Sequence, residues 1–525
     1  MNKIKSFVNK HVHSHSESDG PPPQILASAP VPLQPFPSEQ DFYRYRKQRG
    51  VNLGSWFVLE RWITDAPYRS AAHPGESDHD VARGENGKKI LENHWDEWVK
   101  EEDWKWLSER GINTVRIPIG FYHLCQADPS VLEGTDFSQM YEVFEGAWPR
   151  IVNAIASAQR YGIGVLIAVS TTYLHAVPGK QNGDSHSGTS SSVIAFFRPE
   201  NLARTRHILQ SLLVNLLNAT RNHSPPLVNL VGVELVNEPN PTTPDHTFFH
   251  DWYRSVFSTL AQIDPNTPLY VGDSWRTYDY AGLIQWAPNP RPTLMALDHH
   301  LYRCFTQEDG STPAAMHAQV LRERGQGTPD IFENVANTLN NAGAGLVVGE
   351  WSAALNPGSL VGVDTHTAQR EFVDAQLALY ERECAGTFFW TFKKQWGGDT
   401  GWGLRDAVAS GIFPDRVGMK LKRQVEEDGG RSWRRDQAKT TALNQHVGWW
   451  SNHPGQYEHW RFEEGYTHGW EDAYLFFFSA PSPSGAVPEI GFKGAWVKRR
   501  SADHSRVKGN TDVWEYGTSA LRKAT

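Results

Sequence analysis

The stretch VELVNEPN, at positions 233–240, ends an apolar run with Asn237, Glu238 and Pro239. Strand interiors disfavour all three residue types, so a strand is expected to end here. An amide and a carboxylate side chain then stand at the carboxyl end of that strand. The meaning of Glu238 therefore depends on what the other strands carry at the same end.

Short β-rich apolar runs alternate with longer helical patterns along most of the chain. Eight such runs are present, at 49–54, 113–119, 164–169, 227–238, 268–274, 294–302, 345–351 and 386–392. Helical patterns lie between most of them, at 92–110, 137–161, 198–218, 246–263 and 366–383. Repeated βα units predict an α/β fold with a parallel sheet, and eight of them close most simply into a (β/α)8 TIM barrel.

Polar residues fall where the active site of a barrel is built, at the carboxyl ends of the strands. His300 and Tyr302 end the sixth run, Glu350 ends the seventh, and Trp390 lies near the end of the eighth. A doubly wound open sheet is the alternative. It needs a Gly-rich fingerprint after its first strand, and GVNLGSW (50–56) is a poor match to that pattern.

Three regions are expected from composition. Residues 1–40 are rich in Ser, Pro and His and predict a disordered tail, in which His11, His13 and His15 alternate. A solvated tail is the simpler interpretation of these histidines, with metal binding as the alternative. Residues 41–436 form the predicted barrel, and 437–525 a helix and an aromatic-rich extension that closes it. A carbohydrate-binding module in this last region is the alternative, although strand signals there are few.

Charge and cysteine content narrow the function classes. The net charge of −8, with no basic block longer than 498–500, gives no electrostatic case for nucleic acid or an anionic membrane. The three cysteines have no CxxC spacing, which predicts neither disulfides nor a zinc site. No apolar signal region or membrane span is visible, so we expect a cytoplasmic protein, with leaderless export as the alternative. We also expect a monomer.

Two carboxylates end runs that face each other across the mouth of the predicted barrel. These are Glu238 in the fourth run and Glu350 in the seventh. Such pairs cleave glycosidic bonds, with retention when the carboxyl groups are ~5 Å apart and with inversion at ~6.5–9.5 Å. The sequence leaves both outcomes open. Glu234 and Asp298, which also lie in predicted strands, are interpreted as buried hydrogen-bonding residues.

Seven ordered motifs carry a family resemblance. They are GVNLGSWFVLERWIT (50–64), NTVRIPIGFY (113–122), LHAVPGKQNG (174–183), VELVNEPN (233–240), DHHLY (298–302), VVGEWSAAL (347–355) and FFWTFKKQ (388–395). Together they closely resemble glycoside hydrolase family 5, and most of all the fungal exo-β-1,3-glucanases. The aromatic C-terminal region resembles a subgroup of these enzymes that lacks a secretion signal.

The resemblance implies a retaining double displacement that needs no metal or other cofactor. It implies Glu238 as the acid/base, Glu350 as the nucleophile, Arg116 beside the nucleophile and Asn237 on the sugar 2-hydroxyl. The other implied site residues are His300 and Tyr302, with Tyr302 steadying the nucleophile, Trp390 as a sugar platform, and His175 in the same pocket.

One stretch departs from the family pattern. The chain reads VLIAVSTTYLHAVPG at 165–179, so about six residues, 168–173, occupy the place of one. Either the end of the third strand bulges and displaces His175, or the stretch is an insertion such as an unremoved intron.

The sequence thus predicts a retaining exo-acting hydrolase of β-1,3-glucan or a related β-glucoside. Two alternatives stay open. One is a sugar-binding protein without catalysis, suggested by the 21 tryptophans and the altered third strand. The other is an intracellular hydrolase of a glucosylated lipid or sterol, suggested by the missing secretion signal.

Overall fold

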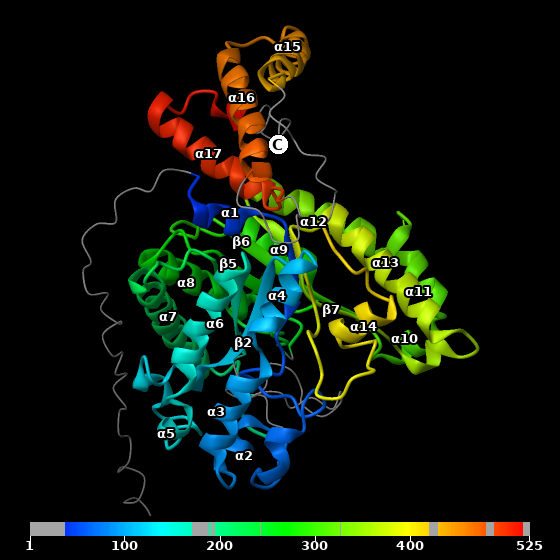
Figure 1. Ribbon diagram of the computed structural model, residues 1–525. Coiled ribbons are helices and arrows are strands. Elements are labelled where there is room, and N and C mark those ends of the chain that lie inside the picture. Colours follow the sequence, from blue (N-terminus) through cyan, green and yellow to red (C-terminus); the bar gives the residue numbers. More distant parts are fainter. Residues whose placement is uncertain are drawn as a thin grey trace, which may run out of the picture.

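Eight parallel strands close into a barrel in the computed structural model (Figure 1). The structure describes residues 37–170, 188–190, 195–241, 243–325, 327–418, 429–478 and 488–517. The strands are β1 (Gln48–Asn52), β2 (Thr114–Gly120), β3 (Gly164–Ser170), β4 (Leu230–Glu234), β5 (Leu269–Gly272), β6 (Met295–Arg303), β7 (Gly345–Leu355) and β8 (Gly386–Phe389). They pair in sequence order, and β8 closes on β1. The predicted (β/α)8 barrel is confirmed.

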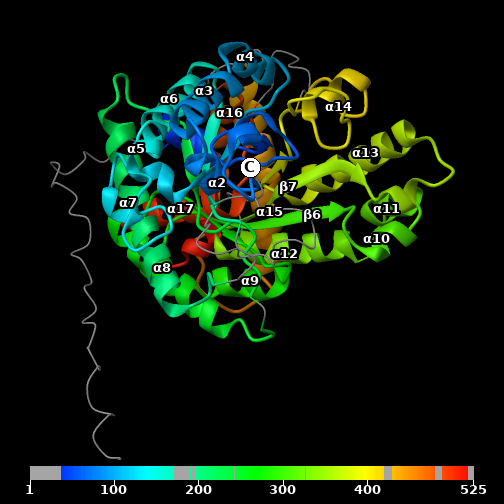
Figure 2. The ribbon, with the colours of Figure 1, turned by 90° about the horizontal axis from the view of Figure 1, so that it is seen from below.

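Helices surround the barrel, as the view along it in Figure 2 shows. They are α1 (Glu39–Tyr45), α2 (Asp78–Arg83), α3 (Gly87–Trp98), α4 (Glu101–Glu109), α5 (Tyr141–Phe144), α6 (Ala147–Arg160), α7 (Pro199–Asn222), α8 (Thr247–Ile263), α9 (Thr277–Gln285), α10 (Gln307–Ser311), α11 (Ala314–Arg322), α12 (Thr328–Ala342), α13 (Thr365–Glu383) and α14 (Leu404–Ser410). The helix expected at 92–110 is two helices, because Val99 and Lys100 have extended backbone between α3 and α4. Among the residues that the structure describes, no helix is both long enough and apolar enough to cross a bilayer.

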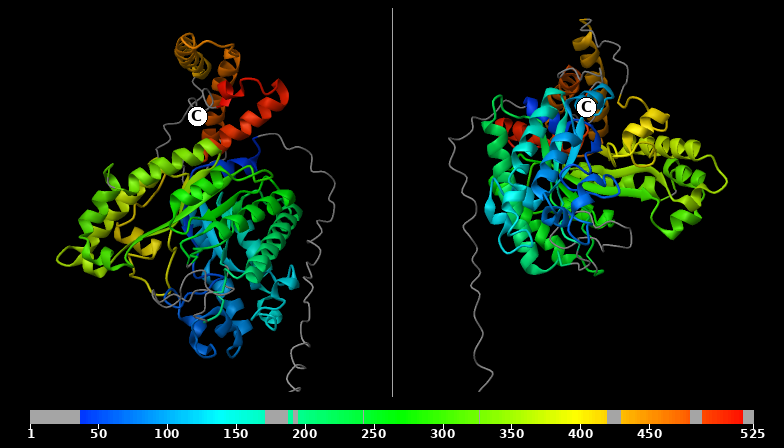
Figure 3. Two further views of the ribbon diagram at one scale, coloured as in Figure 1. Left: turned by 180° about the vertical axis from the view of Figure 1, so that it is seen from behind. Right: turned by 60° about the horizontal axis from the view of Figure 1, so that its bottom comes forward.

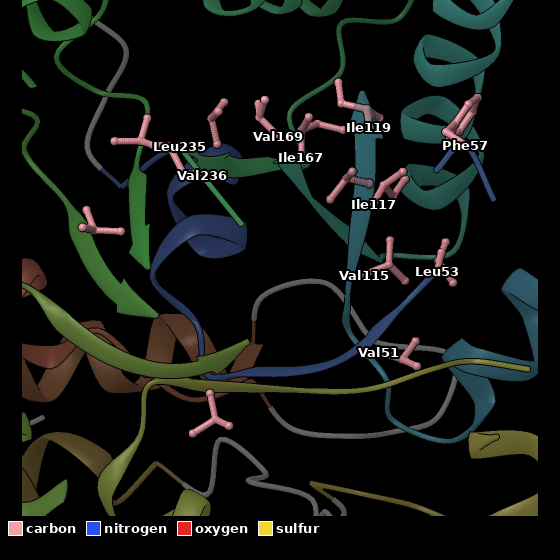
Figure 4. Packing of buried hydrophobic residues seen from close by; sticks show 14 of the residues in the cluster. Val51, Leu53, Phe57, Val115, Ile117, Ile119, Ile167, Val169, Leu235 and Val236 are labelled. Carbon is pink, nitrogen blue, oxygen red and sulfur yellow. The ribbon is translucent and has the colours of Figure 1, made fainter. Parts of the chain in front are cut away.

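Alternation along β2 separates the packing face from the functional face. Val115, Ile117 and Ile119 are buried in the large core between strands and helices (Figure 4). Successive side chains of a strand point to opposite faces, so Arg116 is directed into the barrel. The same alternation that builds the core thus delivers a charged side chain to the barrel interior.

The altered stretch after the third predicted strand begins as regular β-structure. Residues 168–170 pair with 118–120 of β2 in unbroken register, so β3 continues without a bulge against that neighbour. The register shift against β4 lies between Val165 and Leu166, nearer the start of β3. Residues 171–173 and His175 lie outside the described residues.

Three further helices follow the barrel: α15 (Arg431–Trp450), α16 (His459–Phe478) and α17 (Lys493–Lys508). They stand at one end of the barrel in Figures 1 and 3, with α17 beside α1. Phe476, Phe492 and Trp496 share a buried cluster with barrel residues such as Tyr270 and Phe388. Backbone bonds from Lys47 to Glu489 and from Gly491 to Tyr45 lie just before β1. The extension therefore covers the amino ends of the strands and leaves their carboxyl ends to the site.

Candidate active site

Arg116 of β2 is the centre of the polar network inside the barrel. Its guanidinium is fully buried and donates two hydrogen bonds to Glu234 of β4, at 2.5 and 2.9 Å. It also donates to Asn52 Oδ1 of β1 at 2.8 Å, to Asn237 Oδ1 at 2.6 Å and to Glu350 Oε1 of β7 at 2.9 Å. The prediction that Arg116 lies beside Glu350 agrees with this geometry, and Glu234 is the buried partner expected from sequence.

Glu350 is held by two hydrogen-bond donors and lies beside a histidine ring. Besides Arg116, the hydroxyl of Tyr302 donates to its Oε2 at 2.8 Å, and His300 Nδ1 lies 3.5 Å from the same oxygen. Burial, together with the charge of Glu238, raises the pKa of Glu350 above its ordinary value, and the charges of His300 and Arg116 and the Tyr302 hydrogen bond offset part of that rise. The donors thus oppose the effect of burial and favour the ionised carboxylate.

Glu238 reaches the site from a turn and not from a strand. β4 ends at Glu234, four residues earlier than the sequence suggested, although Leu235 still donates its backbone N–H to Tyr270. Glu238 has a φ of 45°, in the left-handed region that few residues other than glycine adopt. Its carboxylate Oε1 lies 2.7 Å from His300 Nδ1. Its side chain is 23% exposed against 9% for Glu350, so it is the carboxylate more open to solvent.

The two predicted catalytic carboxylates are close together. One oxygen of Glu238, one of Glu350 and a ring nitrogen of His300 all lie within 4.8 Å of one another. Such a group is compact enough to hold a metal ion, but Arg116, Tyr302 and His300 already bind the same carboxylates. Positive charge is therefore supplied to the pair by the protein itself.

His300 of β6 lies between three carboxylates. Its Nδ1 faces Glu238 and Glu350, and its Nε2 lies 3.7 Å from Asp298 Oδ2. Burial lowers the pKa of His300, but Glu350, Asp298 and Glu238 together raise it well above its ordinary value. The three carboxylates thus favour the imidazolium form of the ring, in which both nitrogens are donors.

Asp298 differs from its expected role as a hydrogen-bonding residue. Within the described part of the chain, neither of its buried oxygens has a hydrogen-bond partner, and it acts on His300 through charge at 3.7 Å. Gly349 makes room for it, because a Cβ at that position would lie 2.2 Å from Asp298 Oδ1.

The remaining predicted residues are less closely tied to the carboxylates. Asn237 accepts from Arg116 through its amide oxygen, which leaves its amide nitrogen as the donor for a ligand. Trp390 follows β8 and is only 7% exposed, with its ring against Gly54. His175 lies outside the residues that the structure describes.

Sequence reasoning missed several residues of the site region. Asn52 ends the observed strand β1, a strand-end position like those of the other site residues, and its amide nitrogen also donates to the Gly349 carbonyl at 2.9 Å. The ring of Trp402 packs at a tilt against those of Tyr302 and Phe305, with centroid distances of 5.5 and 5.9 Å. Trp275, 46% exposed, donates to the His300 carbonyl. Nothing in the sequence marks Trp402 and Trp275 beyond the high tryptophan content.

Comparisons with known proteins agree with this architecture. The model for "Cellulase (glycosyl hydrolase family 5)" matches residues 83–395, more than half of the chain. The model for "Glucan 1,3-beta-glucosidase 3 C-terminal domain" matches residues 432–525.

Full-length relatives are also found. A Schizosaccharomyces pombe protein named glucan 1,3-beta-glucosidase 3 is 29% identical over 91% of this chain and 94% of its own. An uncharacterized glycosyl hydrolase of Saccharomyces cerevisiae is 28% identical over 98% of this chain and 97% of its own. The crystal structure of AoRut superposes with a TM-score of 0.54 at 19% identity, covering 70% of this chain and 98% of that chain. This last likeness supports the fold alone.

Removing the charge of Arg116 is expected to destabilise the fold strongly. Arg116→Met leaves Glu234 buried without its cation, and breaking a buried ion pair in this way costs about 3–5 kcal/mol. The double variant Arg116→Met/Glu234→Leu is expected to recover part of that loss, because the unpaired charge is gone. Urea unfolding measures both. Arg254→Met, which breaks the exposed pair with Asp251, is the control and is expected to change stability by less than about 1 kcal/mol. Equal midpoints for Arg116→Met and the control would contradict the central role of Arg116.

Proposed function

Because this chain belongs to glycosyl hydrolase family 5 and is an O-glycosyl hydrolase, we propose that it cleaves β-glucosidic bonds with retention of configuration. Its proposed substrate is β-1,3-glucan, attacked from the non-reducing end. Glu350 acts as the nucleophile and Glu238 as the acid/base.

The separation of the two carboxylates carries the proposal of retention. Oxygens of Glu238 and Glu350 lie within 4.8 Å of each other. Retaining glycosidases have carboxyl groups about 5–5.5 Å apart, whereas inverting ones need about 6.5–9.5 Å to admit a water molecule between base and sugar. The shorter distance favours direct attack by a carboxylate on the sugar.

The contacts of each carboxylate support the assignment of roles. Glu350 receives hydrogen bonds from Arg116 and Tyr302, which stabilise an ionised nucleophile. Two carboxylates this close resist ionising together, and the Arg116 hydrogen bond favours the ionised form on Glu350, so a shared proton is best placed on Glu238. Glu238 is also the more exposed of the two carboxylates. An acid/base needs this exposure, because it must contact first the leaving group and then a water molecule.

The reaction proceeds in two displacements. Glu350 attacks the anomeric carbon while the bond from that carbon to the glycosidic oxygen breaks, and Glu238 gives its proton to that oxygen. In the second step Glu238 takes a proton from water, the water oxygen attacks the anomeric carbon, and Glu350 leaves. The amide of Asn237 is positioned by Arg116 to bind the sugar 2-hydroxyl, a contact that strengthens in the transition state.

The names of relatives support a β-1,3-glucan. The Schizosaccharomyces pombe relative is named glucan 1,3-beta-glucosidase 3, and an Aspergillus clavatus relative is named probable glucan 1,3-beta-glucosidase A. The aromatic group Tyr302–Trp402–Phe305 lies beside Glu350 through the Tyr302 hydroxyl, and its rings are suited to stacking on sugar faces, as is Trp390 after β8.

Product analysis tests the reaction. We expect proton NMR of laminari-oligosaccharide hydrolysis to show β-glucose first, with the α anomer appearing only by mutarotation. Substrates with a blocked reducing end are expected to react equally well, because cleavage starts at the other end. α-Glucose as the first product would overturn retention. Hydrolysis of a lipid glucoside with no action on laminari-oligosaccharides would replace the glucan with a different substrate class.

Azide distinguishes the two carboxylates. Glu238→Ala and Glu350→Ala are each expected to lower kcat on an aryl β-glucoside by at least about 10²–10⁴-fold. With azide, Glu350→Ala is expected to form α-glucosyl azide, because azide then attacks in place of the nucleophile. Glu238→Ala is expected to form β-glucosyl azide, because azide attacks the intermediate. The exposed Glu323→Ala variant serves as control with unchanged turnover, and exchanged anomers would reverse the two roles.

The pH profile reports the Tyr302 hydrogen bond. This bond lowers the pKa of Glu350, so Tyr302→Phe is expected to raise that pKa. A nucleophile must be ionised, and the acidic limb of kcat/KM against pH should therefore move to higher pH. Tyr278→Phe, at a 54% exposed tyrosine, is the control. An acidic limb that is unmoved in Tyr302→Phe would argue against Glu350 as the ionised group.

A further inference from the structure

Three potential metal ligands converge in the helical extension, away from the barrel mouth. His446 belongs to α15, His459 is the first residue of α16, and Glu515 lies near the end of the described chain. Glu515 Oε2 is 3.0 Å from His446 Nε2 and 2.9 Å from His459 Nδ1. The three ligand atoms all lie within 4.8 Å of one another.

Glu515 is a buried carboxylate that needs a positive charge nearby. It has no exposed surface, and its second oxygen accepts the backbone N–H of Glu458 at 2.9 Å. Across the described ranges its ion pairs are with the two histidines alone, and no lysine or arginine reaches it. Burying a carboxylate is costly unless it is paired or binds a metal ion.

The donor set and its spacing suit a divalent transition metal. Two imidazole nitrogens and one carboxylate oxygen are typical ligands of Zn²⁺, with metal–ligand bonds of about 2.0–2.2 Å. Tetrahedral bonds of that length separate neighbouring ligand atoms by about 3.3 Å. The observed 2.9 and 3.0 Å are a few tenths shorter, so a small outward shift of the ligands would admit the ion.

Aromatic rings fix the two imidazoles. Phe462 stacks on His446 with ring centroids 4.3 Å apart, and Tyr457 stacks on His459 at 5.6 Å. Trp514 also packs against His446, at 6.0 Å. Such a shell orients ligands and limits the access of water. The side chain of His459 is nevertheless 28% exposed, which provides a route for the ion and room for a water as fourth ligand.

We propose that His446, His459 and Glu515 form a zinc site that ties α15, α16 and the segment around residue 515 together. The site lies away from the barrel mouth and is independent of the barrel chemistry. It departs from two predictions made from the sequence: the cysteine spacing predicted no zinc site, and the family resemblance implied an enzyme that needs no metal. The ligands here are 13, 56 and 69 positions apart, too far and too irregular for a zinc motif to be visible in the sequence.

Metal analysis of the full-length protein tests the site. After exposure to Zn²⁺ and dialysis, the wild-type chain is expected to keep one more zinc per chain than His459→Ala or Glu515→Gln. His453→Ala removes a neighbouring exposed histidine and is the matched control, with zinc content like wild type. Any zinc on the N-terminal histidines or at the barrel site is common to all these variants and cancels. Equal zinc in wild type and His459→Ala overturns the proposal.

Thermal unfolding of the wild-type chain gives a second test that needs no folded variant. A ligand that binds only the folded state raises Tm, so Zn²⁺ is expected to raise Tm above its value in a chelator. The same difference is expected in His453→Ala and is expected to vanish in His459→Ala. A wild-type Tm that does not respond to either zinc or chelator also overturns the proposal.

Discussion

A single buried guanidinium connects the parts of the chain that form the barrel mouth. Arg116 binds Asn52 of β1, Glu234 of β4, Asn237 in the turn after β4, and Glu350 of β7. A charge with no exposed surface is tolerable only because acceptors surround it. Its planar set of donors also fixes the directions in which these acceptors lie. The hydrogen bonds that pair the buried charge of Arg116 therefore also hold the side chains of Glu350 and Asn237 in place.

Charge balance in the site favours a retained proton. Two cations, Arg116 and His300, are surrounded by four carboxylates, those of Glu234, Glu238, Asp298 and Glu350. With every carboxylate ionised, the negative charges of these described residues would outnumber the positive ones by two, and crowding like charges in a largely buried network is costly. A proton on one carboxylate reduces that excess. The fold thus provides both a carboxylate stabilised by Arg116 and a reason for a neighbouring acid to stay neutral.

The periodicity of the sequence predicts the strands and most of the long helices, but it does not predict the side-chain contacts across the barrel. The sequence predicts all eight strands, because short β-rich runs alternate with helical patterns, but it does not predict α9, α11 and α12. It extends the fourth strand to Glu238, because the apolar run continues past Glu234, where β4 ends. Arg116 and Glu350 are 234 residues apart, and the sequence brought them together only through a family resemblance. The roles of Asn52 and Asp298 could not be predicted from the sequence, because they depend on neighbours that are distant in the chain and meet only in the folded protein.

The backbone at Glu238 restricts how this position can change over evolutionary time. Its φ of 45° lies in a backbone region whose conformational free energy is high for β-branched residues and low for asparagine, aspartate or glycine. A replacement must therefore satisfy two separate requirements, one of conformation and one of chemistry. A lineage that lost hydrolysis could drift at this position most easily toward glycine or asparagine, whereas valine or isoleucine would also disturb the turn.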